Sequence, residues 1–252
     1  MIKFLRNILG LGPAEPINLH KKPVENAVKS VVKPIVGEMV LEGDEMDFTT
    51  IYPYLVSKRT KELDLVNELA AVFHETEDIY APIVQAFIMM DKNKIDDKDE
   101  VDLFHLKTSN KDEDDYLKFE EHGLKNLDTL ELPFEFWDFS DKTIEYDVLS
   151  TPISVLASEK ILSKKHMLEA HKMLNSTELL VSIPRKGLIF VCSNLLDKKY
   201  IKHFMNLHAY AIVSEKYQEE VLCEDLFVLK DGEITNIMGI TQLSDILRKG
   251  NV

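Results

Sequence analysis

The order of hydrophobic and polar residues predicts strands and helices that alternate along the chain. Short apolar runs rich in β-branched residues predict strands, and apolar residues that recur every three or four positions predict amphipathic helices. We expect strands at residues 39–41, 51–56, 83–90, 101–106, 134–139 and 143–148. We expect helices over residues 24–36, 60–73, 114–127, 152–158, 163–174, 197–212 and 241–250.

Two segments in the second half of the chain have the pattern of β-hairpins. Residues 178–192 combine two buried strands with a tight turn, in which Pro184 suits the second position of a type I turn and Gly187 suits a left-handed residue. Residues 226–238 form a second hairpin around an Asp-Gly turn. Hairpins favour neighbouring antiparallel strands, so we expect an α+β fold of antiparallel sheets layered with helices.

A change of composition suggests where the chain divides. Residues 91–121 contain twelve Asp or Glu and six Lys, as is typical of a solvated connector. We therefore expect an amphipathic arm at 1–16 and two α+β lobes of similar size at 17–112 and 113–252, with the acidic connector at the end of the first lobe.

The charge of the chain narrows the classes of partner. Its 252 residues include 30 Lys or Arg and 44 Asp or Glu, which gives a net charge of −14. A surface of this sign repels the phosphates of nucleic acids. It is compatible with a basic protein partner, although solubility alone is sufficient to explain the charge. The two cysteines, Cys192 and Cys223, lie in apolar surroundings and fit buried thiols in a reducing cytoplasm. No apolar run is long enough to span a bilayer.

The first eleven residues form a short basic amphipathic pattern. We expect the apolar side to pack on the protein's own core, with a partner protein or a membrane surface as the alternatives. The apolar side consists mainly of Ile2, Phe4, Leu5, Ile8 and Leu9.

Tests for known catalytic and metal-binding motifs fail. His166 and His171 are five residues apart, so on a helix they point in different directions and cannot share a zinc ion. Residues 91–102 resemble a calcium loop but lack its glycine and one oxygen ligand. Arg185 and Lys186 fit a surface turn of two solvated cations, with binding of an anion or partner as the alternative. We expect no cofactor and no metal.

Several segments resemble the bacterial YtpQ-like family, a domain of unknown function. The resemblance covers most of the chain from Ile51 onward and is a pattern of strands, turns and apolar positions. It implies the fold, a cytosolic setting and a bacterial origin, but no activity and no catalytic residue. The matching segments are 51–57, 119–127, 146–161, 179–190 and 226–233.

We therefore expect a cytoplasmic, non-enzymatic module that binds a protein partner or assists one, with dispersed and solvated titratable groups. The alternative is a hydrolase-like enzyme whose site is assembled from distant residues. Its candidate catalytic residues are His74, Glu77, His166 and Glu169. The pattern leaves the oligomeric state open.

Overall fold

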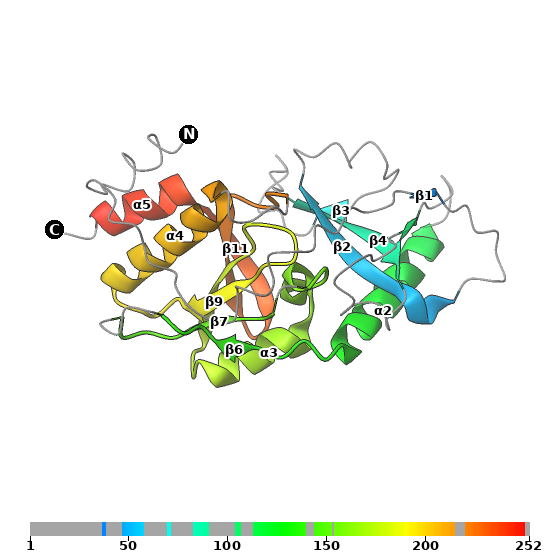
Figure 1. Ribbon diagram of the computed structural model, residues 1–252, viewed down its shortest axis with the longest axis horizontal. Coiled ribbons are helices and arrows are strands. Elements are labelled where there is room, and N and C mark those ends of the chain that lie inside the picture. Colours follow the sequence, from blue (N-terminus) through cyan, green and yellow to red (C-terminus); the bar gives the residue numbers. More distant parts are fainter. Residues whose placement is uncertain are drawn as a thin grey trace.

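The residues that the structure describes form two β-sheets and associated helices (Figure 1). A computed structural model provides the coordinates, and the fold it shows is α+β, as predicted. The division into two lobes of similar size stays a prediction. The structure describes residues 37–38, 47–57, 70–71, 83–90, 104–106, 113–139, 144–152, 154–214 and 220–249.

The first sheet is built around two long strands, β2 (Ile51–Ser57) and β4 (Ile83–Met89). They pair antiparallel along their full lengths, and almost all of their side chains are buried, which explains their continuous apolar sequences. The strand order is β1-β5-β4-β2, and β3 also pairs with β4, so the strand predicted at residues 83–90 is present and lies inside the sheet. The short strands are β1 (Gly37–Glu38), β3 (Ala70–Ala71) and β5 (Phe104–His105).

The predicted helix over residues 60–73 is wrong where the structure describes it. Ala70 and Ala71 form strand β3 and pair with Gln85 and Val84 of β4. Alanine has a high helix propensity, but backbone bonding to a neighbouring strand overrides that weak preference.

Helix α2 (Glu113–Thr129) covers the first sheet on one side. Its buried positions Phe119, Gly123 and Leu127 recur every four residues, as expected for a helix that packs along one stripe. The helix begins at Glu113, one residue before the start predicted from the sequence.

Gly123 sets the distance between α2 and β2. A Cβ atom at this position would lie 3.3 Å from the backbone nitrogen of Pro53 and 3.4 Å from the ring of Phe87. We expect Gly123→Leu to destabilise the protein by about 1–3 kcal/mol, because the added side chain has no space. Gly123→Ala should change stability by less than about 1 kcal/mol, since better helix propensity offsets the tight contact. Urea unfolding measures both.

The matched control is Lys125→Leu, which adds the same side chain on the exposed side of α2. We expect it to change stability by less than about 0.5 kcal/mol. If Gly123→Leu were as stable as this control, close packing of α2 on β2 would be excluded.

The second sheet has six antiparallel strands in the order β11-β10-β8-β9-β7-β6. Both predicted hairpins are present, because β8 pairs with β9 and β10 pairs with β11. The strands are β6 (Glu135–Phe136), β7 (Val148–Ser150), β8 (Glu178–Ser182), β9 (Phe190–Ser193), β10 (Asp225–Lys230) and β11 (Glu233–Gly239).

Helices pack on both faces of the second sheet (Figure 1). Alternate residues along β8 face opposite sides: Leu180 packs with α4 and α5, whereas Leu179 and Val181 pack with α3. The strands buried in the middle are therefore apolar on both faces. The helices are α3 (Lys164–Met173), α4 (Lys198–Val213) and α5 (Ile240–Lys249), and the short 3₁₀ helix η6 (Ser158–Leu162) precedes α3.

The connection between β8 and β9 is longer than the predicted tight turn. The chain reverses at Lys186 and Gly187, where the Leu188 nitrogen donates to the Arg185 carbonyl oxygen at 3.2 Å. Gly187 has φ +67°, so its predicted left-handed conformation is confirmed. Pro184 lies outside the turn because its carbonyl oxygen accepts from Leu222, which extends the paired region.

Other predicted boundaries in this half need correction. The strand predicted at 143–148 begins only at Val148, because its partner β9 ends at Ser193 and leaves earlier residues without a neighbour. The helix predicted at 152–158 is replaced by a turn and then η6. In α3 the buried residues are His166, Met167 and Ala170, whereas Leu168 is exposed.

Candidate functional site

Three consecutive polar residues are fully buried in η6. Ser158, Glu159 and Lys160 each have 0% exposure, although two of them are ionisable. Burying a charge costs several kcal/mol unless it is paired or neutralised. The expectation that titratable groups are dispersed and solvated is therefore wrong for this segment, which we call the buried polar segment.

Glu159 connects the two sheets. Its Oε1 accepts a hydrogen bond from the Leu55 nitrogen of β2 at 3.0 Å, and its Oε2 accepts from the Ser158 hydroxyl at 2.7 Å. The Ser158 oxygen in turn accepts from the Gly187 nitrogen at 3.1 Å. One carboxylate thus links a strand of the first sheet to the β8–β9 connection of the second.

Lys186, in the β8–β9 connection, adds a second contact with β2. Its Nζ donates to the Leu55 carbonyl oxygen and lies 3.4 Å from the centre of the Tyr54 ring. Burial raises the pKa of Glu159, while the positive charge of Lys186 and the bonds from Ser158 and Leu55 oppose that rise. The net direction is upward, so the folded protein favours the protonated carboxyl more than water does.

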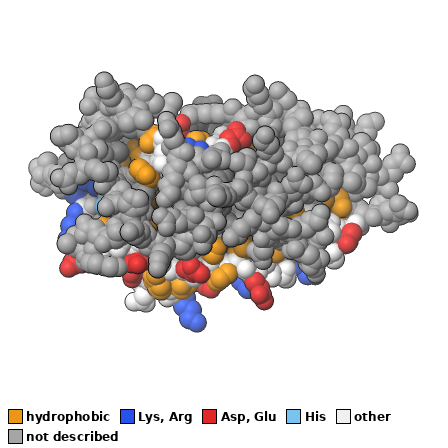
Figure 2. Space-filling view, in the orientation of Figure 1, with side chains coloured by type: hydrophobic (Ala, Val, Ile, Leu, Met, Phe, Trp, Pro, Cys, Tyr) orange, Lys and Arg blue, Asp and Glu red, His pale blue; other side chains and the backbone are white. Residues whose placement is uncertain are grey.

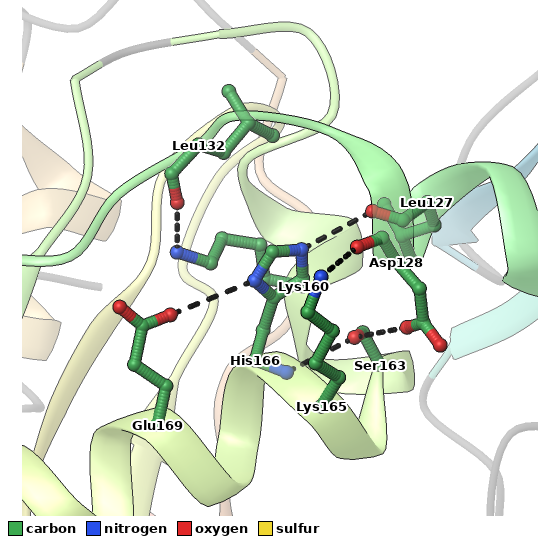
Figure 3. A network of polar contacts seen from close by, with 8 residues as sticks. All are labelled: Leu127, Asp128, Leu132, Lys160, Ser163, Lys165, His166 and Glu169. Atoms are coloured by element: carbon green, nitrogen blue, oxygen red, sulfur yellow. Dashed lines mark hydrogen bonds and ion pairs between the residues drawn. The ribbon is translucent and has the colours of Figure 1, made fainter.

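Lys160 makes a second set of contacts (Figure 3). Its Nζ donates to the Leu132 carbonyl oxygen and lies 3.2 Å from the centre of the Phe134 ring. Burial lowers the pKa of Lys160 to about 7, and the nearby carboxylate of Glu169 only partly opposes this shift. A lysine near neutral charge at physiological pH can act as an acid or a base.

The first turn of α3 brings His166 beside Lys160. Ser163 caps the helix, since its hydroxyl oxygen accepts from the His166 nitrogen at 3.1 Å. The His166 ring donates from Nε2 to the Leu127 carbonyl oxygen at 3.1 Å. Its Nδ1 is buried without a hydrogen-bond partner and lies 3.9 Å from the Glu169 carboxylate. Burial lowers the pKa of His166, and the positive charge of Lys160 adds a smaller shift in the same direction.

Two of the four predicted catalytic candidates therefore lie together. His166 and Glu169 are one helical turn apart, and the structure adds Lys160 to them (Figure 3). His74 and Glu77 lie outside the described residues, as do the calcium-like loop at 91–102 and the N-terminal candidates Ile2, Phe4, Leu5, Ile8 and Leu9.

The predicted surface turn of two solvated cations is wrong. Arg185 is partly buried and donates from Nε to the Ala211 carbonyl oxygen at 2.7 Å and from Nη2 to that of Ile212 at 2.5 Å. It thereby satisfies carbonyl groups at the C-terminal end of α4, where a cation is favoured. With Lys186 bonded to Leu55, both side chains bond to the protein's own backbone.

Two further histidines, His171 and His208, are held by hydrogen bonds. His171 donates from Nδ1 to the Ser176 carbonyl oxygen at 2.7 Å. His208 is fully buried between Ser182 and Glu224, and burial lowers its pKa to about 4, so it is neutral at pH 7. Cys192 and Cys223 are buried free thiols. Among the described residues, no group of three or more His, Cys, Asp or Glu is placed to hold a metal ion.

The sequence contains a signal for the missed residues Glu159 and Lys160. They stand in the run Val155-Leu-Ala-Ser-Glu-Lys-Ile-Leu162, where apolar residues flank three polar ones. Charged residues between apolar neighbours are either a solvated turn or a buried polar group that has partners elsewhere. Only the position of β2 distinguishes these alternatives.

Comparison of the chain with protein-family models, with curated proteins and with solved structures found no match. The resemblance to the YtpQ-like family therefore stays a prediction. In the part of the chain that the structure describes, no helix combines the length and the hydropathy that a transmembrane span requires.

Proposed function

We propose that the protein is a non-enzymatic accessory module that binds a basic protein partner in the cytoplasm. The observation that carries this proposal is how the buried ionisable groups are used. Glu159, Lys160 and His208, together with the partly buried Arg185, all bond to backbone groups of the protein's own strands, helices and loops. Side chains held in this way are occupied by the protein's own backbone and are not free to bind a substrate.

The surface charge supports a basic partner. Helix α2 contains six Asp or Glu against two Lys, and the chain as a whole has a net charge of −14. Along the lower edge of the face in Figure 2, carboxylates lie among hydrophobic side chains together with a few Lys or Arg side chains. An excess of negative charge favours association with a surface of opposite sign.

The test compares two charge reversals of equal size. Immobilised wild-type protein is used to capture a partner from bacterial lysate at low salt, and the partner is then titrated in purified form. We expect Glu120→Lys with Glu121→Lys on α2 to weaken binding about tenfold or more, because like charges then face each other. Added salt should weaken the wild-type complex.

The control reverses Glu220 and Asp245, which are exposed outside α2. It changes the net charge equally and should weaken binding less. Capture of no basic protein, or equal weakening by both reversals, would count against a partner site on α2.

A second candidate function is a hydrolase-like enzyme that uses Lys160, His166 and Glu169. Their proximity favours it, since a lysine of pKa about 7 suits acid–base catalysis near neutral pH. A panel of ester, phosphate and glycoside substrates tests it with Glu169→Gln as the variant. Activity that disappears in this variant at unchanged melting temperature would establish the enzyme, and absence of turnover in the wild type would remove it.

A further inference from the structure

The end of α2 is held by the region around the start of α3. Three side chains donate to carbonyl oxygens at or after the last turn of α2: His166 Nε2 to Leu127 at 3.1 Å, Lys165 Nζ to Asp128 at 2.6 Å, and Lys160 Nζ to Leu132. The Ser163 hydroxyl also donates to the Asp128 carboxylate at 2.5 Å. Helix α2 packs on the first sheet and α3 on the second, so these bonds connect the two sheets (Figure 3).

The geometry at His166 determines which of its nitrogens carries a proton. A carbonyl oxygen only accepts, so Nε2 must be the donor to Leu127 and the neutral ring leaves Nδ1 as an unprotonated acceptor. That Nδ1 is buried, has no donor and lies 3.9 Å from the Glu169 carboxylate, which is another acceptor. If Nδ1 took up a proton, it could donate to the Glu169 carboxylate.

Lys160 lies near enough to the same carboxylate for its charge to matter. Its side chain is fully buried beside the Phe134 ring, and the charge of Glu169 raises its pKa against the effect of burial. The charged groups that act on His166 are Lys160 and Glu169 and, from α2, Asp128. Lys165 bonds to α2 from the exposed side. Two buried proton-binding groups therefore lie near one half-exposed carboxylate.

We infer that Lys160, His166 and Glu169 form a proton-sensitive joint that holds the end of α2 against α3 and opens as the pH falls. In the closed joint both basic groups are buried, and in the open joint both reach water. Opening is therefore accompanied by proton uptake, and protons favour the open form by mass action.

The pKa shifts determine over which pH range the joint opens and in which direction. Burial lowers the pKa of Lys160 from 10.5 to about 7, so the open fraction can increase up to about tenfold for each unit that the pH falls between these values. His166 acts in the same direction below its ordinary pKa of 6.5, because burial lowers its pKa too. The joint is thus most firmly closed in alkaline solution.

Hydrogen exchange of the full chain, followed by mass spectrometry from pH 6 to pH 9 and corrected for intrinsic rates, tests this inference. In the wild type, protection of residues 127–136 and 160–170 should fall several-fold for each unit from pH 9 to pH 7, while residues 225–239 stay constant. Lys160→Met should abolish this dependence. Lys165→Met, which removes a neighbouring lysine bonded to the same helix end, should retain it.

Glu169→Gln is a second test variant. We expect it to fold, because Glu169 is half-exposed. Glu169 raises the pKa values of both Lys160 and His166, so its removal should lower protection at pH 6 several-fold and leave it nearly unchanged at pH 9. A Lys160→Met protein with the wild-type pH dependence would overturn the inference. A Glu169→Gln protein with the wild-type protection at pH 6 would also overturn it. The same holds if the protection of all segments, including residues 225–239, changed equally with pH.

Discussion

Replacement of Glu159 by alanine is expected to destabilise the protein by about 3–5 kcal/mol, the usual cost of breaking a buried charged network. The change leaves the Leu55 nitrogen without its acceptor and removes a negative charge close to Lys186. It also leaves a cavity in an interior where Glu159 has no exposure. Urea unfolding at pH 7 measures the loss.

The matched variant Glu159→Gln keeps the size of the side chain and an oxygen that can accept from Leu55. We expect it to change stability by less than about 1.5 kcal/mol, as a neutral group of similar shape avoids the cost of burying charge. The pKa of Glu159 is raised in the folded protein, so the stability contributed by its protonated form is lost as the pH rises through that window. The stability of Glu159→Gln relative to the wild type should therefore improve from pH 4 to pH 7. Equal destabilisation by alanine and glutamine would contradict this account.

Replacement of Lys160 by methionine is expected to stabilise the protein by about 1–4 kcal/mol near pH 7, because a hydrophobic side chain of similar length needs no charge in the interior. The Leu132 carbonyl oxygen loses a donor, which offsets this gain by about 1 kcal/mol. The pKa of Lys160 falls from 10.5 to about 7 on folding, so its unfavourable contribution is fully present below pH 7. It disappears as the pH approaches 10.5.

Thermal unfolding of Lys160→Met and the wild type at pH 6.5 and pH 9.5 measures this effect. The difference in melting temperature should be large at the lower pH and smaller at the higher one. The exposed Lys165→Met is the control and should show no such trend. A Lys160→Met protein that is less stable than the wild type at both pH values would show that the contacts with Phe134 and Leu132 outweigh the cost of burial.

Local patterns were sufficient to predict most of the strands and helices. The Asp-Gly turn between β10 and β11 is present, with φ +50° at Asp231 and +79° at Gly232, because these residues tolerate the left-handed conformation. Ser163 precedes an apolar repeat, and a serine in that position indicates a helix cap. Errors occurred where distant partners decide the structure, as at Ala70 and Ala71, which form a strand only because β4 lies beside them.

The site was harder to predict than the fold. His166 and Glu169 are one helical turn apart, so their proximity follows from helix geometry alone. Glu159 and Lys160 were missed because their burial depends on contacts far along the chain: Leu55 is 104 residues away from Glu159, and Leu132 is 28 residues away from Lys160. No spacing rule within one sequence connects such positions.

The buried polar segment holds the two sheets together through the bond between Glu159 and the backbone of β2. Native-state hydrogen exchange of residues 51–57 in Glu159→Ala, compared with Glu159→Gln, is the decisive test of this role. We expect β2 to lose protection in the alanine variant before β8 and β10 do, and the glutamine variant to behave as the wild type. Wild-type protection of β2 in Glu159→Ala would exclude this role of Glu159.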